Sequence, residues 1–338
     1  MAPQSPVAPA LSAAAVHRAL RALAAAEAGI VRCAVAWSGG LDSTVLLHAL
    51  RTRPAQGPRI RLRALHVDHG LQPAAAAFRI FCQRTARRWR LPLTVLRVRV
   101  DLLPGVSVEQ AAREARREAL AAALAPGELL LTAQHADDQL ETVLLALLRG
   151  AGPRGLSGMP AAMPLAGTRL LRPLLQYDRA AIAAYAAAAG LDWVEDPTNA
   201  DVRFDRNYLR ASVLPALRQR WPAAARTALR SARHCASVVA TLESLTIRDL
   251  AAAADGGGLE IAVLRRFGPA RRADVLRAWL QRAGCRAPNE RHLHEIEAMM
   301  AARRDAHPQL RLPDCVLRRS GGSLTVHLNP LARRHPKG

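Results

Sequence analysis

A loop between an apolar run and a helical pattern has the composition of a phosphate-binding site. The apolar run 33–37 predicts a buried strand, and apolar residues at helical spacing follow the loop. Free N–H groups and the helix dipole make such a helix start attractive to anions, and glycines let a phosphate approach the backbone. Serine hydroxyls add donors, and an aspartate could hold a magnesium ion that bridges phosphates. The loop consists of Ser38, Gly39, Gly40, Leu41, Asp42 and Ser43.

The same residues also suit an ordinary tight turn in which Asp42 caps the helix, and the local pattern leaves that alternative open. Two common nucleotide-binding motifs are absent from this stretch. The motif G-x-x-x-x-G-K-[ST] is excluded because the only lysine of the chain is Lys337, and no G-x-G-x-x-G occurs there. A phosphate site at this loop would therefore belong to neither of those two classes.

Three carboxylates, Asp137, Asp138 and Glu141, stand at the start of another predicted helix. Asp138 and Glu141 are three residues apart, and Asp137 and Glu141 are four apart, so each pair shares one helix face. Such a face could bind an ammonium group or accept its proton. Acidic residues in a first helical turn also complement the helix dipole, which explains many similar clusters.

Basic residues at helical spacing form two further candidate sites. Arg113 and Arg116 follow Glu109 on one predicted helix face, which is ordinarily solvated. These two arginines would stabilise phosphate charge only if they were turned toward a nucleotide. Arg206 and Arg210 lie one helical turn apart with aromatic residues nearby, a pattern suited to phosphate and base contacts. A loop held by Asx turns also explains this second pattern.

Histidines and cysteines do not indicate a metal site. His66, His69 and His135 include no pair at the i, i+4 spacing that places two ligands on one helix. The five cysteines lie far apart and form no C-x-x-C, which argues against an iron–sulfur cluster, a zinc ribbon or a disulfide framework. This cysteine usage fits a reducing cytoplasm, and no apolar run is long enough to span a membrane.

The charge balance indicates a polyanionic partner. The chain has 48 basic and 27 acidic residues, a formal net charge of +21 and a pI near 11.5. A strongly basic protein attracts nucleic acid. A basic enzyme that binds no nucleic acid is the alternative.

Apolar runs alternate with helical patterns through the first half of the chain. The alternation predicts an α/β fold with a doubly wound, mostly parallel sheet, whose ligands lie beyond the carboxyl ends of the strands. That topology would gather Ser38, His66 and Gln134 at one rim. Segment 150–167 is rich in Gly and Pro and predicts a long loop that could act as a lid. The predicted strands are 33–37, 60–68, 93–100, 128–132 and 170–175, and the predicted helices are 74–90, 107–124, 137–149 and 178–189.

The 338 residues suit a catalytic domain, a helical connector and a small α+β domain. The glycine-rich run 255–258 is the best linker candidate. Two helices, at about 269–283 and 289–303, and a hairpin around 320–322 are predicted for the small domain. The predicted boundaries are 1–220 for the catalytic domain, 221–258 for the connector, 259–328 for the small substrate-binding domain and 329–338 for a basic tail.

The loop at 38–43 resembles the pyrophosphate-binding loop of the N-type PP-loop ATP pyrophosphatases, enzymes with an adenine nucleotide alpha hydrolase-like fold. With its later motifs, the chain is similar to the tRNA(Ile)-lysidine synthetase (TilS) family over most of its length. The run Glu-Asp-Pro-Thr-Asn, followed by Arg-Asn-Tyr-Leu-Arg, is the most discriminating part. The resemblance extends over 38–43, 66–72, 109–116, 133–142, 149–160, 172–174, 195–210, 214–217 and, more loosely, 259–324.

This resemblance implies an ATP-dependent carbon–nitrogen ligase. ATP would adenylate the C2 carbonyl oxygen of the wobble cytidine in the CAU anticodon of tRNA(Ile). The ε-amine of free lysine would then attack C2, and lysidine, AMP and pyrophosphate would be the products. The implied site residues are Asp138 and Glu141 for lysine, Asp42 for magnesium and phosphates, Arg113 or Arg116 for the transferring phosphate, His66 and Asp68 for the adenosine, and Arg206 and Arg210 for tRNA.

The chain departs from the family pattern at two positions, since Gln134 stands where a histidine is usual and Arg117 where an aromatic residue is usual. Longer family members also carry a further C-terminal domain. A PP-loop tRNA thiolase is the main rival interpretation, although such enzymes commonly need paired cysteines. A non-catalytic basic RNA-binding protein is the second rival, and a homodimer stays an open alternative to a monomer.

Overall fold

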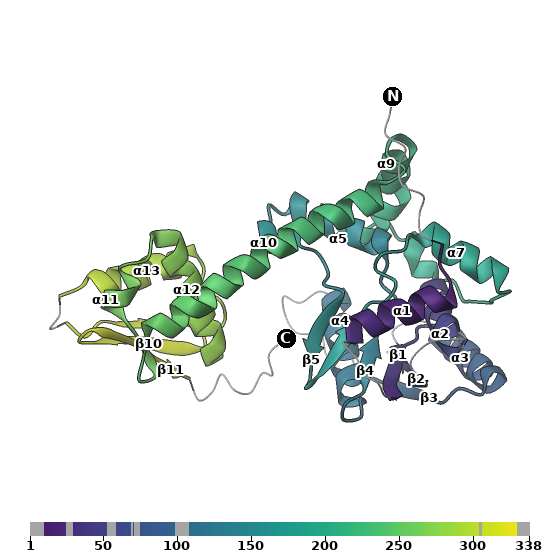
Figure 1. The fold of residues 1–338 in the computed structure, drawn as a ribbon, viewed down its shortest axis with the longest axis horizontal. Coiled ribbons are helices and arrows are strands. Elements are labelled where there is room, and N and C mark those ends of the chain that lie inside the picture. The colour runs from purple at the N-terminus through teal and green to yellow at the C-terminus, as the bar shows by residue number, and fades with distance from the viewer. Residues whose placement is uncertain are drawn as a thin grey trace. The chain divides into compact units, whose positions relative to one another are not determined.

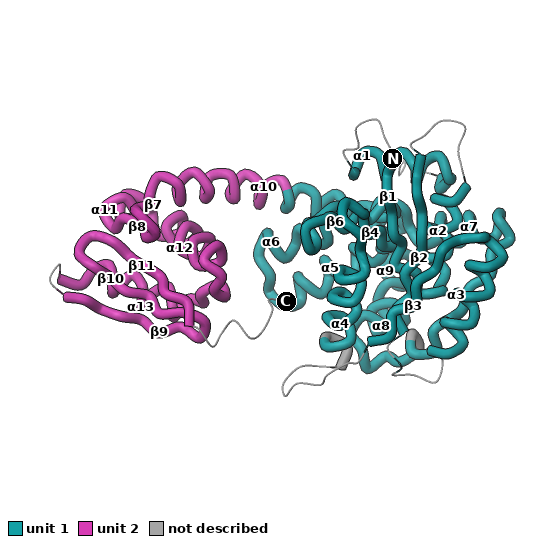
Figure 2. Tube along the Cα trace, turned by 90° about the horizontal axis from the view of Figure 1, so that it is seen from below, with its two compact units in different colours: residues 1–236 teal, residues 237–338 magenta. Residues whose placement is uncertain are grey.

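The computed structural model describes residues 10–24, 30–52, 59–68, 70, 75–98, 108–303 and 306–329. The chain divides into two compact units, residues 1–236 and 237–338, and the division falls within one long helix, α10 (Ala224–Ala253) (Figure 2). Each unit has its own sheet and its own hydrophobic core. No described helix is long and apolar enough to cross a membrane.

A six-stranded sheet forms the centre of unit 1 (Figure 1). Its strands are β1 (Ile30–Ala36), β2 (Arg59–Asp68), β3 (Leu93–Arg97), β4 (Leu129–Leu131), β5 (Ala162–Leu165) and β6 (Thr168–Leu171). They lie in the order β3-β2-β1-β4-β6-β5, and all neighbours pair in parallel except β5 and β6. The strand order reverses between β1 and β4, and sheets of this kind bind ligands beyond the carboxyl ends of the strands at such a point.

Helices pack on both faces of this sheet. They are α1 (Ala13–Ala24), α2 (Leu41–Arg51), α3 (Ala75–Trp89), α4 (Val108–Ala122) and α7 (Arg179–Ala188). A further helix, α5 (Ala136–Leu148), packs instead against α10, through Leu140 and Ala225. One core joins α1, α2, α3 and α7 to the sheet and includes Val35 and Leu46, whereas a smaller core joins α4 to the sheet through Ala34 and Leu120. Because successive strand residues point to opposite faces, Ala34 and Val35 belong to different cores. The doubly wound α/β fold predicted from the alternation is confirmed.

Segment 150–167 is not the long loop that its composition predicted. It contains the short helix α6 (Pro153–Leu156) and strand β5, which forms an antiparallel hairpin with β6. The turn consists of Ala166 and Gly167, whose φ angles of 43° and 76° are those of a two-residue hairpin turn. Pro164 is tolerated because β5 is an edge strand. Sequence analysis missed the strand because a proline inside a short apolar run argues against one.

Unit 2 is a small α+β domain built on five antiparallel strands in the order β7-β8-β11-β10-β9. Two predicted helices are confirmed as α12 (Pro269–Ala283) and α13 (Glu290–Ala301), and the predicted hairpin is formed by β10 (Cys315–Ser320) and β11 (Ser323–Leu328). Trp279 and Ile296 pack in its core. The other elements are β7 (Ala254–Asp255), β8 (Gly258–Glu260), α11 (Ile261–Leu264) and β9 (Gln309–Arg311).

The glycine run predicted as a linker is a tight turn inside unit 2. Gly256 and Gly257, with φ angles of 52° and 111°, connect β7 to β8. Gly258 lies within β8, where a Cβ would come within 2.3 Å of the carbonyl oxygen of Leu324. Turn geometry and close strand packing therefore require glycine here. The linker prediction was wrong because a flexible linker has the same glycine-rich composition. Residues 330–338 of the predicted tail lie outside the described residues.

An ion pair joins β2 to the start of β4. Arg63 Nε and Nη2 donate to the two carboxylate oxygens of Glu128 at 2.7 and 2.6 Å, and the Glu128 side chain is only 5% exposed. The hydrogen bonds from Arg63 hold the pKa of Glu128 below its ordinary value of 4.5, although burial opposes them. The carboxylate form is therefore favoured by the fold.

The substitution Glu128→Gln should lower the free energy of unfolding by about 2 kcal/mol near neutral pH, because Arg63 loses its charged partner. Since the pKa of Glu128 is lower in the folded state, this contribution is present above about pH 4.5 and is lost as the pH falls through the folded pKa. Urea unfolding should show that the difference from wild type narrows in acid. The exposed carboxylate of Asp192 provides a control, Asp192→Asn, and a constant difference below about pH 4.5 would contradict the assignment.

Candidate active site

Loop 38–43 connects β1 to α2 and is closed by hydrogen bonds among its own residues. The Ser38 and Ser43 hydroxyl oxygens are 3.0 Å apart, and the Gly40 N–H donates to Ser38 Oγ at 3.2 Å. Gly39 has a φ of 92°, and a Cβ there would lie 3.1 Å from Cys82 Sγ. The backbone conformation and the tight contact both require glycine at position 39.

No side chain caps α2. Its N-cap residue is Gly40, which makes no side-chain hydrogen bond, and Asp42 lies in the first turn. The alternative in which Asp42 caps the helix is therefore wrong. The first-turn amides stay available to an anion, as at other anion-binding helix starts. Asp42 Oδ1 is buried and has no hydrogen-bond partner among the described residues.

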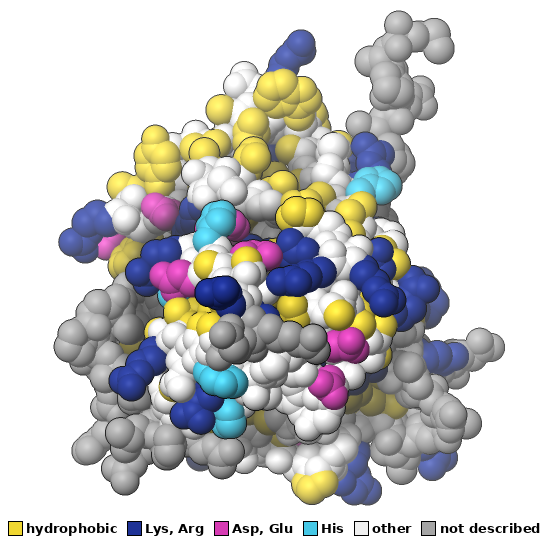
Figure 3. Space-filling model, turned by 90° about the vertical axis from the view of Figure 1, so that its left-hand side faces the viewer, with side chains coloured by type: hydrophobic (Ala, Val, Ile, Leu, Met, Phe, Trp, Pro, Cys, Tyr) yellow, Lys and Arg dark blue, Asp and Glu magenta, His cyan; other side chains and the backbone are white. Residues whose placement is uncertain are grey.

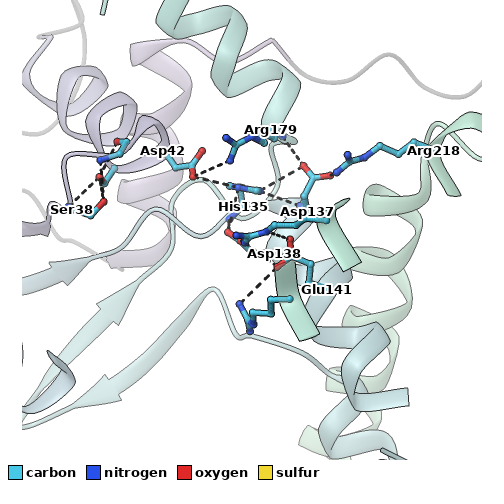
Figure 4. A network of polar contacts seen from close by, with 12 residues as sticks. Ser38, Asp42, His135, Asp137, Asp138, Glu141, Arg179 and Arg218 are labelled. Carbon is cyan, nitrogen blue, oxygen red and sulfur yellow. Dashed lines mark hydrogen bonds and ion pairs between the residues drawn. The ribbon is translucent and has the colours of Figure 1, made fainter. Parts of the chain in front are cut away.

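His135 begins α5 and lies between this loop and the acidic residues (Figure 4). Its Nδ1 accepts the N–H of Asp137 at 3.2 Å, while the Asp138 carboxylate accepts the N–H of His135 at 3.0 Å, which completes a capping box. Its Nε2 lies 3.7 Å from Asp42 Oδ2 and 3.4 Å from Asp138 Oδ2. Burial lowers the pKa of His135, but the carboxylates around it outweigh burial and leave that pKa raised.

Asp137 anchors α5 to its neighbours. It is buried, and its Oδ2 accepts the N–H of Arg179 at the start of α7 at 2.7 Å. Its Oδ1 accepts from Arg218 Nη2 at 2.6 Å, and Arg218 belongs to α9 (Leu214–Arg220). Both oxygens of Asp137 are engaged within the protein, so the ligand-binding face of α5 depends on the other two carboxylates.

Asp138 and Glu141 share one face of α5 (Figure 4). Both bind Arg210. Arg210 Nε and Nη2 donate to the two oxygens of Glu141 at 2.5 and 3.0 Å, and Nη2 also reaches Asp138 Oδ1 at 2.9 Å. Arg206 forms a longer ion pair with the buried Glu141 at 4.0 Å. Burial raises the pKa of Glu141, and Arg210 offsets this only in part. The acidic pair therefore holds a cationic group, which the chain itself supplies.

A cavity of about 370 Å³ lies at the carboxyl ends of β1, β2 and β4, where the sheet topology predicted a site. Many of the predicted site residues line this nucleotide-sized cavity. They are Ser38, Gly40, Asp42, Ser43, His66, Asp68, Asp138 and Arg206. The predicted residues outside its lining are Gly39, Leu41, Arg113, Glu141 and Arg210.

Arg116, Thr132 and Gln134 also line the cavity, and the sequence had suggested a role for Arg116 alone. Arg116, considered there as an alternative to Arg113, lines the cavity, and Arg113 lines a neighbouring hollow. Loss of hydration lowers the pKa of Arg116, and Asp196 opposes that change. Thr132 Oγ1 and Gln134 Oε1 are buried without a hydrogen-bond partner among the described residues. Their place directly after β4 was the only sequence signal for these two side chains.

His66 and Asp68, at the end of β2, form one wall of the cavity. His66 Nδ1 lies 2.9 Å from the Trp37 carbonyl oxygen, and burial lowers the pKa of this histidine. Asp68 pairs with Arg79 at 2.7 Å. His69 lies outside the described residues, and no group of three His, Cys, Asp or Glu side chains in the described ranges could hold a metal ion.

The most discriminating sequence run is held against loop 38–43. The Val194 N–H donates to the Gly39 carbonyl oxygen at 3.0 Å. Asn207 Nδ2 donates to the carbonyl oxygens of Thr198 and Asp201 at 2.9 and 3.0 Å, so the second half of the run holds the first half in place. One backbone hydrogen bond from Val194 and two side-chain hydrogen bonds from Asn207 therefore hold the run beside the cavity, whose lining includes Asp196 and Arg206.

Comparison with known proteins identifies both units. A family model described as a PP-loop domain matches residues 12–217, and one described as a TilS substrate binding domain matches residues 259–325. A tRNA(Ile)-lysidine synthase from Alkalilimnicola ehrlichii is 48% identical over 286 residues, which cover 84% of this chain and 64% of that one. The corresponding protein of Pseudomonas aeruginosa is 46% identical over 301 residues, covering 86% and 67%. The chain belongs to the tRNA(Ile)-lysidine synthase family.

Membership of this family confirms the resemblance seen in the sequence. The chain spans 64% and 66% of the length of the lysidine synthases from A. ehrlichii and Escherichia coli O157:H7. A solved structure, the U34-tRNA thiolase NcsA from Methanococcus maripaludis with its [4Fe-4S] cluster, is similar with a TM-score of 0.51 and 14% identity. That match covers 65% of this chain and 77% of the thiolase, and it shows a shared PP-loop fold alone.

In this lysidine synthase family member, Asp137→Asn should destabilise unit 1 by about 1–3 kcal/mol, because the buried carboxylate loses its charge opposite the partly exposed Arg218. Chemical denaturation followed by circular dichroism measures the change. Asp205→Asn is the control, since Asp205 is exposed and pairs with Arg149 only at 3.6 Å; it should change stability by less than about 0.5 kcal/mol. Equal effects of the two substitutions would contradict the anchoring role of Asp137.

Proposed function

We propose that the chain converts the wobble cytidine of a tRNA(Ile) with a CAU anticodon to lysidine, using ATP and free lysine in the cytoplasm. The observation that carries this proposal is the juxtaposition of an anion-binding loop and an acidic pair at one cavity. Asp42 of the loop and Asp138 of the pair both lie within 4 Å of His135 Nε2. One side of the cavity suits phosphates and the other suits an amine, and lysidine formation needs both.

The C2 carbonyl oxygen of cytidine is a poor leaving group until it is adenylated. In the proposed reaction it attacks the α-phosphorus of ATP and releases pyrophosphate, which loop 38–43 would hold through its amides and hydroxyls. The lysine ε-amine then attacks C2, the bond to O2 breaks, AMP leaves with that oxygen, and the amine gives up a proton. Asp138 and Glu141 would orient the amine, and the raised pKa of Glu141 suits it to accept the proton.

Asp42 fits a magnesium ion. Its Oδ1 is buried without a partner among the described residues, and proteins commonly hold Mg²⁺ by one or two carboxylates together with substrate phosphates. Burial raises the pKa of Asp42, but His135 and Arg179 outweigh it and leave the pKa lowered, so the group is a carboxylate near neutral pH. A bound magnesium ion would neutralise charge on the phosphates.

Arg116 is the better candidate for stabilising the transferring phosphate. It lines the cavity with Ser38, Asp42 and Ser43, whereas Arg113 lies outside the lining. Guanidinium groups act on charge that develops on phosphate only when they are placed against it. We therefore assign this role to Arg116 in place of Arg113.

Arg210 occupies the position proposed for the lysine amine. The ε-amine can bind both carboxylates only if Arg210 gives up its bonds to at least one of them. Arg210 lies in the π-helical turn η2 (Leu209–Val213), and such turns are frequent at functional sites. The neighbouring Phe204 and Tyr208 are exposed and could stack on RNA bases. We therefore assign Arg210 to the acidic pair in the free protein and propose that it turns toward tRNA when lysine binds.

Basic side chains are available for the phosphate backbone of tRNA. Figure 3 shows many arginine side chains on one face, together with a smaller number of acidic ones. The match to a TilS substrate binding domain in residues 259–325 supports a tRNA-binding role for unit 2. Neutralising phosphates releases counterions, so tRNA binding should weaken steeply with salt.

The thiolase alternative has less support. All five cysteines are free, and the two that lie close together, Cys285 and Cys315, are buried in the core of unit 2. Cys82, which packs against Gly39, has its pKa raised by burial to about 12. A persulfide relay needs an accessible thiolate, which that environment disfavours.

The test is incorporation of radiolabelled lysine into tRNA(Ile) with a CAU anticodon, in the presence of ATP and magnesium, with tRNA(Met) carrying the same anticodon as the control. We expect incorporation into tRNA(Ile) alone. Glu141→Gln should lower incorporation about a hundredfold, because the amine loses a charged partner and a base, while Asp192→Asn should leave it unchanged. Wild-type incorporation by Glu141→Gln would contradict the role of the acidic pair. ATP cleavage on tRNA without lysine incorporation would show that the nucleophile is wrong.

A second prediction separates the two arginines of α4. Arg116→Met should lower the rate of tRNA-dependent ATP cleavage to AMP and pyrophosphate about 100-fold or more, whereas Arg113→Met should lower it less than about tenfold. Single-turnover measurements with saturating ATP and tRNA compare the chemical step directly. The opposite order of the two effects would return the role to Arg113.

A further inference from the structure

A second cavity, of about 580 Å³, contains a buried arginine that has no acidic partner among the described residues. Arg172 follows β6 and is 8% exposed. Its Nη1 donates to the Pro160 carbonyl oxygen at 2.6 Å, its Nη2 lies 3.6 Å from Met163 Sδ, and its Nε has no partner among the described residues. A buried guanidinium ordinarily has a carboxylate or another anion against it, because desolvating an uncompensated charge is costly. The described part of the chain supplies no such anion to Arg172.

The lining of this cavity is basic. Arg18 on α1 and Arg233 on the unit 1 part of α10 are exposed and line it together with Arg172. No aspartate or glutamate among the described residues belongs to its lining. Burial, together with the nearby Arg113, lowers the pKa of Arg172 to about 10. At neutral pH the guanidinium is still charged, so three positive groups from three separate elements share one hollow.

This cavity is distinct from the nucleotide-sized cavity. The two share no lining residue among those described. Asp138 lines the first and its neighbour Gln139 lines the second, so helix α5 separates them. Gln139 also exchanges two hydrogen bonds with the backbone of Met159, at 3.2 and 2.8 Å, which fixes the loop that forms one wall of the second cavity.

We propose that Arg172, Arg18 and Arg233 form a binding site for a phosphoryl group. The planar fork of a guanidinium matches phosphate oxygens. Three guanidinium groups around one hollow therefore suit a tetrahedral dianion as the bound ligand better than they suit a ligand with one carboxylate. The phosphoryl group belongs either to the RNA backbone or to a free phosphate. The bound anion supplies the counter-charge that the described residues do not give to Arg172.

The experiment is a thermal-unfolding titration with sodium phosphate at constant ionic strength, with saturating α,β-methylene-ATP present to fill the nucleotide-sized cavity. The melting temperature of the wild type should rise saturably with phosphate. The double variant Arg18→Gln/Arg233→Gln should need about tenfold or more phosphate for the same rise. The matched control, Arg21→Gln/Arg230→Gln, removes the same charge from exposed positions of the same two helices outside the lining and should respond as wild type.

Arg172→Met should abolish the phosphate-dependent rise in melting temperature. If Arg172→Met does not fold, the double variant Arg18→Gln/Arg233→Gln, here called the rim variant, tests the proposal. An unsaturable wild-type response, or equal responses of the rim and control double variants, would overturn the proposal.

Filter binding of tRNA then distinguishes the sources of the phosphoryl group. Weaker tRNA binding by the rim variant than by the control, with competition by phosphate, identifies RNA as the source, and equal tRNA binding identifies free phosphate. Because the titration measures no lysine transfer, its outcome is independent of whether lysidine is formed.

Discussion

The site depends on holding like charges together at the start of α5. A loop suited to phosphates and three carboxylates meet at one rim of the sheet, so anionic groups face anionic groups across a few ångströms. Four basic side chains compensate this charge: His135 and Arg179 beside Asp42, Arg210 between Asp138 and Glu141, and Arg218 against Asp137. The carboxylates can lie beside the proposed phosphate position only because these basic side chains offset their charge. The basic side chains depend in turn on α7, α9 and η2, which pack against α5. The architecture around the cavity follows from this balance of charge.

The three carboxylates of α5 differ in function because their partners differ. Asp137 is bonded twice within the protein and fixes the helix. Asp138 and Glu141 share Arg210, which stands in a π-helical turn, and burial raises the pKa of Glu141. A group of this kind exchanges partners more readily than a doubly anchored one. The proposed exchange of Arg210 for a lysine amine uses this difference.

Arg172 presents the opposite case. Most of the buried charges described in unit 1, such as Glu128 and Asp137, meet an opposite charge from the chain. Arg172 meets backbone and sulfur atoms and another arginine. The same principle that explains the paired residues therefore points to an anion from outside the chain at the unpaired one.

Much of the fold was predictable because its signals are local. Strands β1, β2 and β4 and the helices of both units followed from apolar runs and helical spacing, and the family followed from loop 38–43 and the run at 195–210. The errors arose where one composition fits two structures. The glycines of 255–258 suit a linker and a tight turn alike. Pro164 argues against a strand in general, although a strand at the edge of a sheet tolerates it. Sequence patterns were enough to predict which groups could do chemistry and which fold would gather them. The folded structure was needed to show that Arg210 neutralises Glu141, 69 residues away in the chain, that Arg116 lines the cavity, and that Arg172 has no acidic partner among the described residues. The physical reason is that ion pairs, burial and cavity walls are made between elements distant in sequence, and local periodicity carries no information about them.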